Sequence, residues 1–199
     1  MRFAMFGAAL FAATLAHAQV PLSIGVSGGA PLSVSAMRAM CEETDAIWRA
    51  AGVVIVWRAS GSAPDLRVVF DDRAPTPRDR RLVAVGWLTF DADVPAPIVH
   101  LSYANALRLF EESSGIAGPL DAMKPWQRET LVARALGRAL AHELGHFLSG
   151  SKQHTHDGLM RGQRSAAELF EPGRASFAIE PSMRALAVSR IARVTASRD

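Results

Sequence analysis

The sequence predicts an α+β fold in which a mixed, twisted sheet packs on helices, one of them long. Three observations support this prediction. Four short apolar runs of strand-like composition lie between residues 53 and 102. Helical patterns precede and follow these runs. The longest helical pattern is rich in alanine and ends in the residues HELGH, at positions 142–146. The expected order is therefore a helix, a group of strands, and then a long helix with a polar motif at its end.

Four helices are predicted from capping residues and apolar spacing. Ser35 can cap a helix that runs through Ala51 and is ended by Gly52. Pro125 suits the first turn of the long helix, whose many small residues allow it to lie close against a sheet. Cys41 is the only cysteine, so no intrachain disulfide can form, and we interpret it as a buried helix residue. The predicted helices span residues 35–51, 103–112, 125–148 and 181–196.

Strands are predicted where short runs are apolar and rich in β-branched residues. Gly86 permits the close approach of another backbone. The run 82–90, which contains it, is therefore our candidate for an edge strand that pairs with an extended substrate. A strand without a substrate role remains the alternative. The run 98–102 is more evenly apolar and is expected in the interior of the sheet, although Pro95 and Pro97 precede it. The predicted strands span residues 53–57, 66–70, 82–90 and 98–102, and residues 19–33 form an irregular arm with room for one short strand.

The first eighteen residues are predicted to be a signal peptide. A positively charged start is followed by thirteen apolar residues and by an Ala-His-Ala cleavage site at residues 16–18, before Gln19. The apolar stretch is too short to span a bilayer comfortably, and no second suitable stretch follows. We therefore expect a secreted or periplasmic protein whose residues 19–199 form one domain, with no membrane span after cleavage.

The charge pattern argues against nucleic acid as a partner. The formal net charge is only +3, and the sequence holds no dense run of lysine and arginine. Four arginines between residues 73 and 81 stand beside three aspartates, which is typical of a solvated loop. Hydrophobic residues make up 49% of the chain, a share that excludes a disordered protein.

The motif that carries chemistry is His142-Glu143-Leu144-Gly145-His146. On a helix, residues four apart lie on the same face, so His142 and His146 can bind one zinc ion together. Glu143 would then lie beside the open position of the metal, where a water binds. A helix with ordinary surface histidines is the alternative interpretation.

A catalytic zinc site needs a third protein ligand. Gly150 can end the helix in a left-handed turn, after which the chain can double back and present another histidine. His154 is the favoured third ligand, with His156 as the first alternative and Asp157 or another acid as the second.

The stretch from residue 142 to residue 160 resembles the metzincin metalloproteases, whose motif is HExxHxxGxxH followed by a methionine turn. Within that group it looks most like the matrixins, because Leu159 and Met160 closely follow the third histidine. The family places its glycine three residues, and its third ligand six residues, after the second histidine. Here Gly150 is four residues and His154 eight residues after His146, which indicates a loop whose ligand has shifted.

This resemblance implies a zincin- or metzincin-like fold and a secreted, monomeric zinc-dependent endopeptidase that acts on proteins or peptides. Zn²⁺ would be held by His142, His146 and His154, and Glu143 would serve as the general base. Two alternatives remain: a secreted protein that binds zinc without turnover, and a zinc hydrolase that acts on a non-peptide amide such as cell-wall material. An intact Glu143 argues against the first, and the Gly-Leu-Met turn favours a peptidase over the second.

Overall fold

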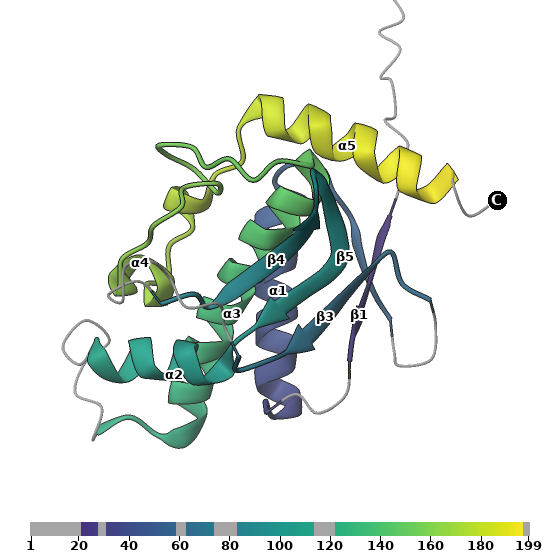
Figure 1. Cartoon of the computed structure of the whole chain (residues 1–199). Coiled ribbons are helices and arrows are strands. Elements are labelled where there is room, and N and C mark those ends of the chain that lie inside the picture. The colour runs from purple at the N-terminus through teal and green to yellow at the C-terminus, as the bar shows by residue number, and fades with distance from the viewer. Residues whose placement is uncertain (1–20, 28–30, 59–62, 74–82, 114–121, 197–199) are drawn as a thin grey trace, which may run out of the picture.

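The computed structural model describes residues 21–27, 31–58, 63–73, 83–113 and 122–196 (Figure 1). The predicted signal peptide and its cleavage site lie outside these residues. A single sheet packs on a long central helix, a second helix lies beside that one, and a third crosses one end of the sheet (Figure 1). No helix of the described residues is long and apolar enough to cross a membrane.

The sheet is mixed, as predicted. Its five strands lie in the order β2-β1-β3-β5-β4. The pairs β1–β2, β1–β3 and β3–β5 are parallel, and β4 pairs with β5 in the antiparallel direction. β4 therefore forms one edge of the sheet and β5 lies in its interior, which confirms both predictions about their positions. The strands are β1 (Leu22–Val26), β2 (Ile55–Arg58), β3 (Leu66–Phe70), β4 (Gly86–Asp91) and β5 (Val94–Leu101).

The helices match the predicted ones closely. The first is capped by Ser33 rather than by Ser35, and Cys41 on it is half-buried rather than buried. The long helix has proline at its start and ends at Gly150 in the left-handed conformation, with φ 67°. Two short elements that follow the HELGH motif were not predicted. The helices are α1 (Val34–Arg49), α2 (Tyr103–Glu112), α3 (Pro125–Ser149), α4 (Ala166–Phe170), the 3₁₀ turn η2 (Ala175–Phe177) and α5 (Pro181–Ala196).

The long helix α3 is buried between α1 and the sheet because small residues line both of its contacts. A Cβ atom on Gly137 would lie 2.6 Å from the carbonyl oxygen of Met40 on α1. On the sheet side, a Cβ atom on Gly86 of β4 would lie 3.3 Å from Cγ of Glu143. Trp48 of α1 also donates a hydrogen bond from its indole nitrogen to the carbonyl of Ala141, at 3.1 Å. The core therefore fixes the half of α3 that carries the HELGH motif.

A buried ion-pair network joins α3 to α1 and to the chain that follows the motif. The Arg138 side chain is fully buried, and its Nε donates to Oε1 of Glu43 at 2.8 Å. Its Nη2 donates to the carbonyl of Gly173 at 2.6 Å, and its Nη1 donates to the carbonyl of Glu168. Arg174 donates from Nη2 to the other oxygen of Glu43 at 2.6 Å. One arginine thus connects three segments that are distant in the sequence.

Replacing Arg138 by methionine should lower the free energy of unfolding by about 3 kcal/mol, because the buried Glu43 would lose one of its two cationic partners. Urea unfolding followed by circular dichroism would measure this change. Arg108→Met is the matched control, since Arg108 forms only an exposed pair with Glu112 at 3.6 Å and should cost less than about 0.5 kcal/mol. Equal losses for the two variants would contradict the role given to Arg138.

Candidate metal centre

Two histidines of α3 face the same point beside the sheet. His142 and His146 are separated by one helical turn, and their Nε2 atoms lie 3.1 Å apart. His146 is buried and His142 is half-buried. Because α3 is fixed by the core on both sides, the two imidazoles are held by a rigid element rather than by a loop.

The other ring nitrogen of each of these histidines hydrogen bonds to a backbone carbonyl. The Nδ1 of His142 lies 2.8 Å from the carbonyl oxygen of Leu159, and the Nδ1 of His146 lies 2.6 Å from that of Ser151. A carbonyl oxygen can only accept, so each Nδ1 carries the proton and each Nε2 presents a lone pair. Such partners fix the ring orientation of metal-binding histidines.

His154 completes the cluster from the loop that follows α3. Its Nε2 lies 3.3 Å from the Nε2 of His146, and the ligand atoms of the three histidines all lie within 4.8 Å of one another. The chain can approach this closely because residue 162 is glycine: a Cβ atom there would lie 2.8 Å from Cγ of the His154 ring. The structure thus brings together the three histidines that the sequence predicted.

The alternative third ligands lie elsewhere. A hydrogen bond of 2.9 Å from the backbone nitrogen of Thr155 to the carbonyl of Met160 closes the loop after His154. Beyond this point His156 points into solvent with 97% of its side chain exposed, and it contacts Asp157 at 3.0 Å. Neither side chain belongs to the histidine cluster.

The cluster has the properties of a cation site. Burial lowers the pKa of His142 to about 4 and also lowers the pKa of His146, so both rings are neutral near pH 7. With Nδ1 protonated in both, their Nε2 lone pairs face each other without a proton to share. A positive ion between them would relieve this repulsion, and neutral imidazole is the form that binds metals. The three histidines could therefore hold a metal ion.

Glu143 lies next to the cluster on α3, with its side chain against Gly86 of β4. It is buried, and among the described residues it takes part in no hydrogen bond or ion pair. Without a metal, desolvation raises the pKa of Glu143 to about 8. A divalent cation beside it would act in the opposite direction and favour the carboxylate.

Met160 lies beneath the cluster. A Cβ atom on Gly145 would be only 2.2 Å from the Sδ of Met160, so the methionine occupies the space that a side chain at position 145 would need. Met160 is 4% exposed. The Gly-Leu-Met turn therefore packs against the helical turn between the two histidines of α3.

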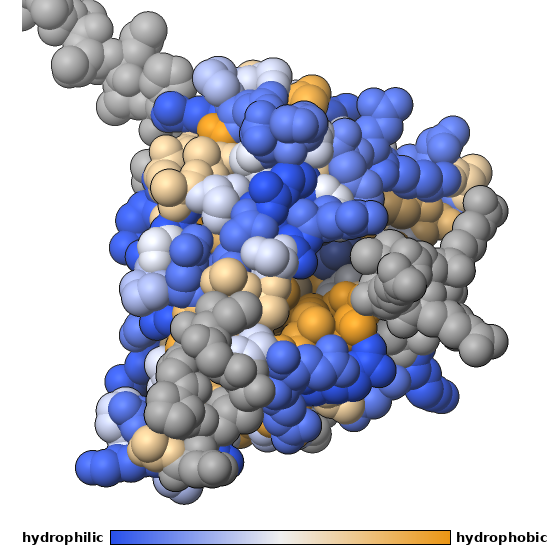
Figure 2. Space-filling model, turned by 90° about the vertical axis from the view of Figure 1, so that its left-hand side faces the viewer, coloured by the Kyte–Doolittle hydropathy of each residue, from blue (hydrophilic) through white to orange (hydrophobic). Residues whose placement is uncertain are grey.

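A large cavity of about 1040 Å³ opens beside the histidines. Its wall includes the three histidines, Glu143, the edge strand β4 from Gly86 to Leu88, and residues 161–165. Figure 2 shows this side of the molecule, with hydrophobic surface inside a hollow and hydrophilic surface along its upper border. A ligand in the cavity would contact the candidate metal site and the edge of the sheet together.

Comparison with known proteins supports the fold. No protein-family profile and no curated protein matches the chain. Among solved structures, the chain is similar to the crystal structure of archaemetzincin from Methanopyrus kandleri, with a TM-score of 0.52 and 14% sequence identity. The match covers 90% of this chain and 99% of that one. The chain has a metzincin-like fold. The resemblance predicted from residues 142–160 is confirmed by this match and by the histidine cluster.

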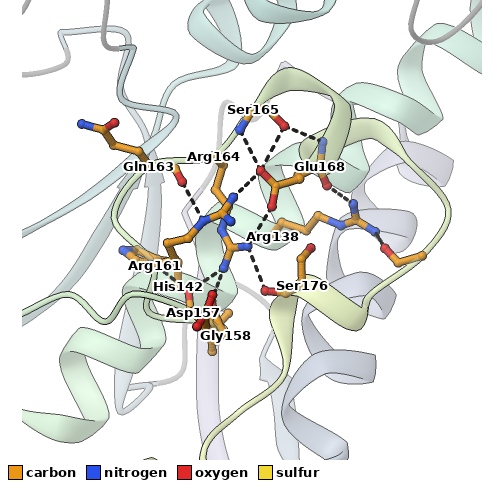
Figure 3. Close-up of polar contacts among 12 residues, drawn as sticks. Arg138, His142, Asp157, Gly158, Arg161, Gln163, Arg164, Ser165, Glu168 and Ser176 are labelled. Carbon is orange, nitrogen blue, oxygen red and sulfur yellow. Dashed lines mark hydrogen bonds and ion pairs between the residues drawn. The ribbon is translucent and has the colours of Figure 1, made fainter.

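In this metzincin-like site, sequence reasoning missed the residues that support the methionine turn (Figure 3). Arg164 donates from Nη1 to the carbonyl of Ser176 at 2.8 Å, and from Nη2 to the carbonyls of Gly158 and, at 3.3 Å, of Leu159. The Leu159 carbonyl also accepts from Nδ1 of His142. Arg164 therefore fixes the carbonyl that orients a candidate metal ligand. An arginine in a polar loop has no periodic pattern, so no signal in the sequence could have identified it.

Proposed function

We propose that this protein is a zinc-dependent endopeptidase that hydrolyses peptide bonds in protein or peptide substrates. One observation carries the proposal. Three imidazole nitrogens converge beside Glu143, at a cavity bordered by the edge strand β4. The metzincin-like fold agrees with it.

The donor set fits zinc. In tetrahedral geometry with Zn–N bonds of about 2.05 Å, two bound nitrogens lie about 3.3 Å apart. The Nε2 separations of 3.1 and 3.3 Å in the cluster are close to this value. Three neutral imidazoles leave a fourth position open, as in catalytic rather than structural zinc sites. When bound, zinc supplies a Lewis acid that acidifies a water and polarises a carbonyl group.

The chain's own residues would transfer the protons and position the peptide. Glu143 is placed to accept a proton from a water in the cavity and to pass it to the leaving amine. Among the described residues no strand pairs with the outer edge of β4, so its backbone groups can hydrogen bond to an extended peptide. Gly86 keeps this edge close to Glu143. A peptide paired with β4 would therefore place a backbone carbonyl beside the histidine cluster, where the water that Glu143 deprotonates could attack it.

The predicted signal peptide supports a place outside the cytoplasm. Residues 1–18 would be removed after Ala18, and the remaining chain would act as a secreted or periplasmic monomer. Cys41 is the only cysteine, so no intrachain disulfide is needed in an oxidising compartment.

The proposal is tested by incubating the purified protein with a denatured protein mixture. We expect fragments to form, their formation to stop after treatment with a chelator, and activity to return when one equivalent of zinc per chain is added, because the described residues hold one histidine cluster. Zinc binding without fragments would favour a binding protein without turnover. Release of products only from cell-wall material would favour the hydrolase of non-peptide amides.

A further inference from the structure

Cationic side chains outnumber carboxylates along the wall of the cavity beside the histidines. Among the described residues that line it, four are cationic and two are carboxylates. One of the carboxylates is Glu143, which the proposed reaction uses as a base. The only other one, Glu168, lies among the arginines and accepts hydrogen bonds from two of them. The lining cations are Arg138, Lys152, Arg161 and Arg164.

Three of these four cationic side chains are held by hydrogen bonds or ion pairs to other groups of the protein. Arg138 is fully buried and uses all three of its nitrogens on Glu43 and on two backbone carbonyls. Arg164 uses both of its terminal nitrogens on backbone carbonyls and on Glu168. Lys152 donates to the carbonyl of Ala92 at 2.5 Å, pairs with the carboxylate of Asp93 at 3.3 Å and lies over the ring of Phe90. These side chains hold the cavity wall in place.

Arg161 is different (Figure 3). Its Nε donates to the carbonyl of Gln163 at 3.0 Å, and its Nη2 donates to Glu168. Among the described residues, its Nη1 has no hydrogen-bond partner. The side chain is 33% exposed, so one end of the guanidinium is fixed while the other remains accessible. A guanidinium held in this way can bind a carboxylate without losing much conformational freedom.

The backbone of Arg161 also lies close to the histidine cluster. It forms an isolated parallel bridge with Thr155, the residue after His154. The next residue, Gly162, lies against the His154 ring. Arg161 and the three histidines also line the same cavity, so a peptide side chain that enters it beside the cluster can approach Arg161.

The neighbouring charges support an anion at this place. Burial and then the positive charge of Arg161 lower the pKa of the Arg164 guanidinium, with Arg138 adding to the effect. Arg161 and Arg164 share a single carboxylate, that of Glu168. A second carboxylate beside Arg161 would offset more of this positive charge, and a wall with an excess of one sign of charge attracts ligands of the opposite sign.

We propose that Arg161 is a specificity-determining residue that selects peptides with an acidic side chain, glutamate or aspartate, next to the scissile bond. This inference rests on the proposed peptidase function. The carboxylate would accept hydrogen bonds from Nη1 of Arg161 inside the cavity, while the peptide backbone lies along β4.

The test uses the zinc-loaded full chain and two fluorogenic peptides that differ only in glutamate or glutamine beside the cleavage site. The site is first identified by mass spectrometry of a digested peptide mixture. We expect kcat/KM to be about 10- to 100-fold higher for the glutamate peptide, the range for a hydrogen bond to a charged group. Arg161→Gln should abolish this preference, and Arg161→Lys should retain part of it. Arg38→Gln, which removes an exposed charge on α1 outside the cavity, should leave it unchanged.

Two further arms separate the possible failures. Both peptides carry an amidated C-terminus, and a preference seen only with a free C-terminus would assign the pocket to the terminal carboxylate and overturn the proposal. The affinity of both peptides for the zinc-loaded Glu143→Gln variant, measured by calorimetry, tests the pocket without turnover. If the wild-type chain cleaves no peptide of the mixture, the binding experiment uses peptides with a single central glutamate or glutamine, and tighter binding of the glutamate peptide would then support the pocket and reject the peptidase function. Equal kcat/KM values, or no difference in binding, would overturn the pocket.

Discussion

Glu143→Gln should reduce peptide hydrolysis by a factor of about 100 or more while zinc stays bound. The amide has nearly the shape of the carboxylate but cannot accept a proton from water. Glu143 is not one of the three residues of the histidine cluster, and it takes part in no hydrogen bond among the described residues. Its replacement should therefore leave the cluster intact. Steady-state kinetics and elemental analysis of the same preparation would measure both quantities.

The matched control for this variant is Glu171→Gln, which neutralises an exposed carboxylate outside the cavity and should retain full activity. Retained activity in Glu143→Gln would remove Glu143 as the base. A loss of zinc together with activity would show that the carboxylate supports the metal site itself, and it would contradict the separation of roles proposed for α3.

His154→Ala should weaken zinc binding by more than about 100-fold, which exceeds the usual cost of losing an outer partner of a metal site. The neighbouring variant His156→Ala should change the affinity by less than about tenfold, because the ring of His156 is exposed and contacts only Asp157. The two substitutions lie two residues apart in one loop, so each serves as the control for the other. Competition with a chromogenic chelator would measure both affinities.

The opposite result would change the assignment of the third metal ligand. If His156→Ala loses the metal and His154→Ala keeps it, the loop must rearrange when zinc binds. If neither variant loses the metal, an acid would be the third ligand, and the similarity of the site to the metzincin motif would weaken.

Much of the fold could be predicted because its signals are local. The helices Tyr103–Glu112 and Pro181–Ala196 and the strand Leu66–Phe70 have the predicted bounds. A serine cap precedes the start of α2, and a proline occupies the first turn of α5. The start of β5 was predicted too late, at Ile98 rather than at Val94. Pro95 and Pro97 disfavour a strand locally, whereas the antiparallel pairing with β4 stabilises one there.

The candidate site was predictable where it depends on helical spacing and not where it depends on the loop. The separation of His142 and His146 follows from one helical turn. The choice between His154 and His156 depends on the turn closed by Thr155 and Met160, whose geometry no spacing rule contains. The arginine contacts of the cavity wall join residues up to 95 positions apart, and polar loops carry no pattern from which such pairs could be inferred.

The division of the histidines between a helix and a loop has a consequence for the entropy of metal binding. His142 and His146 lie on α3, which the hydrophobic core holds in place whether or not an ion is present. His154 lies on an exposed segment that is joined to this core through the packing of Met160 against Gly145. Two thirds of the ligand set is therefore preorganised, and the ordering cost of binding falls on the short segment from Gly150 to Met160. The affinity for the ion can thus change through this segment alone, without any change in the core.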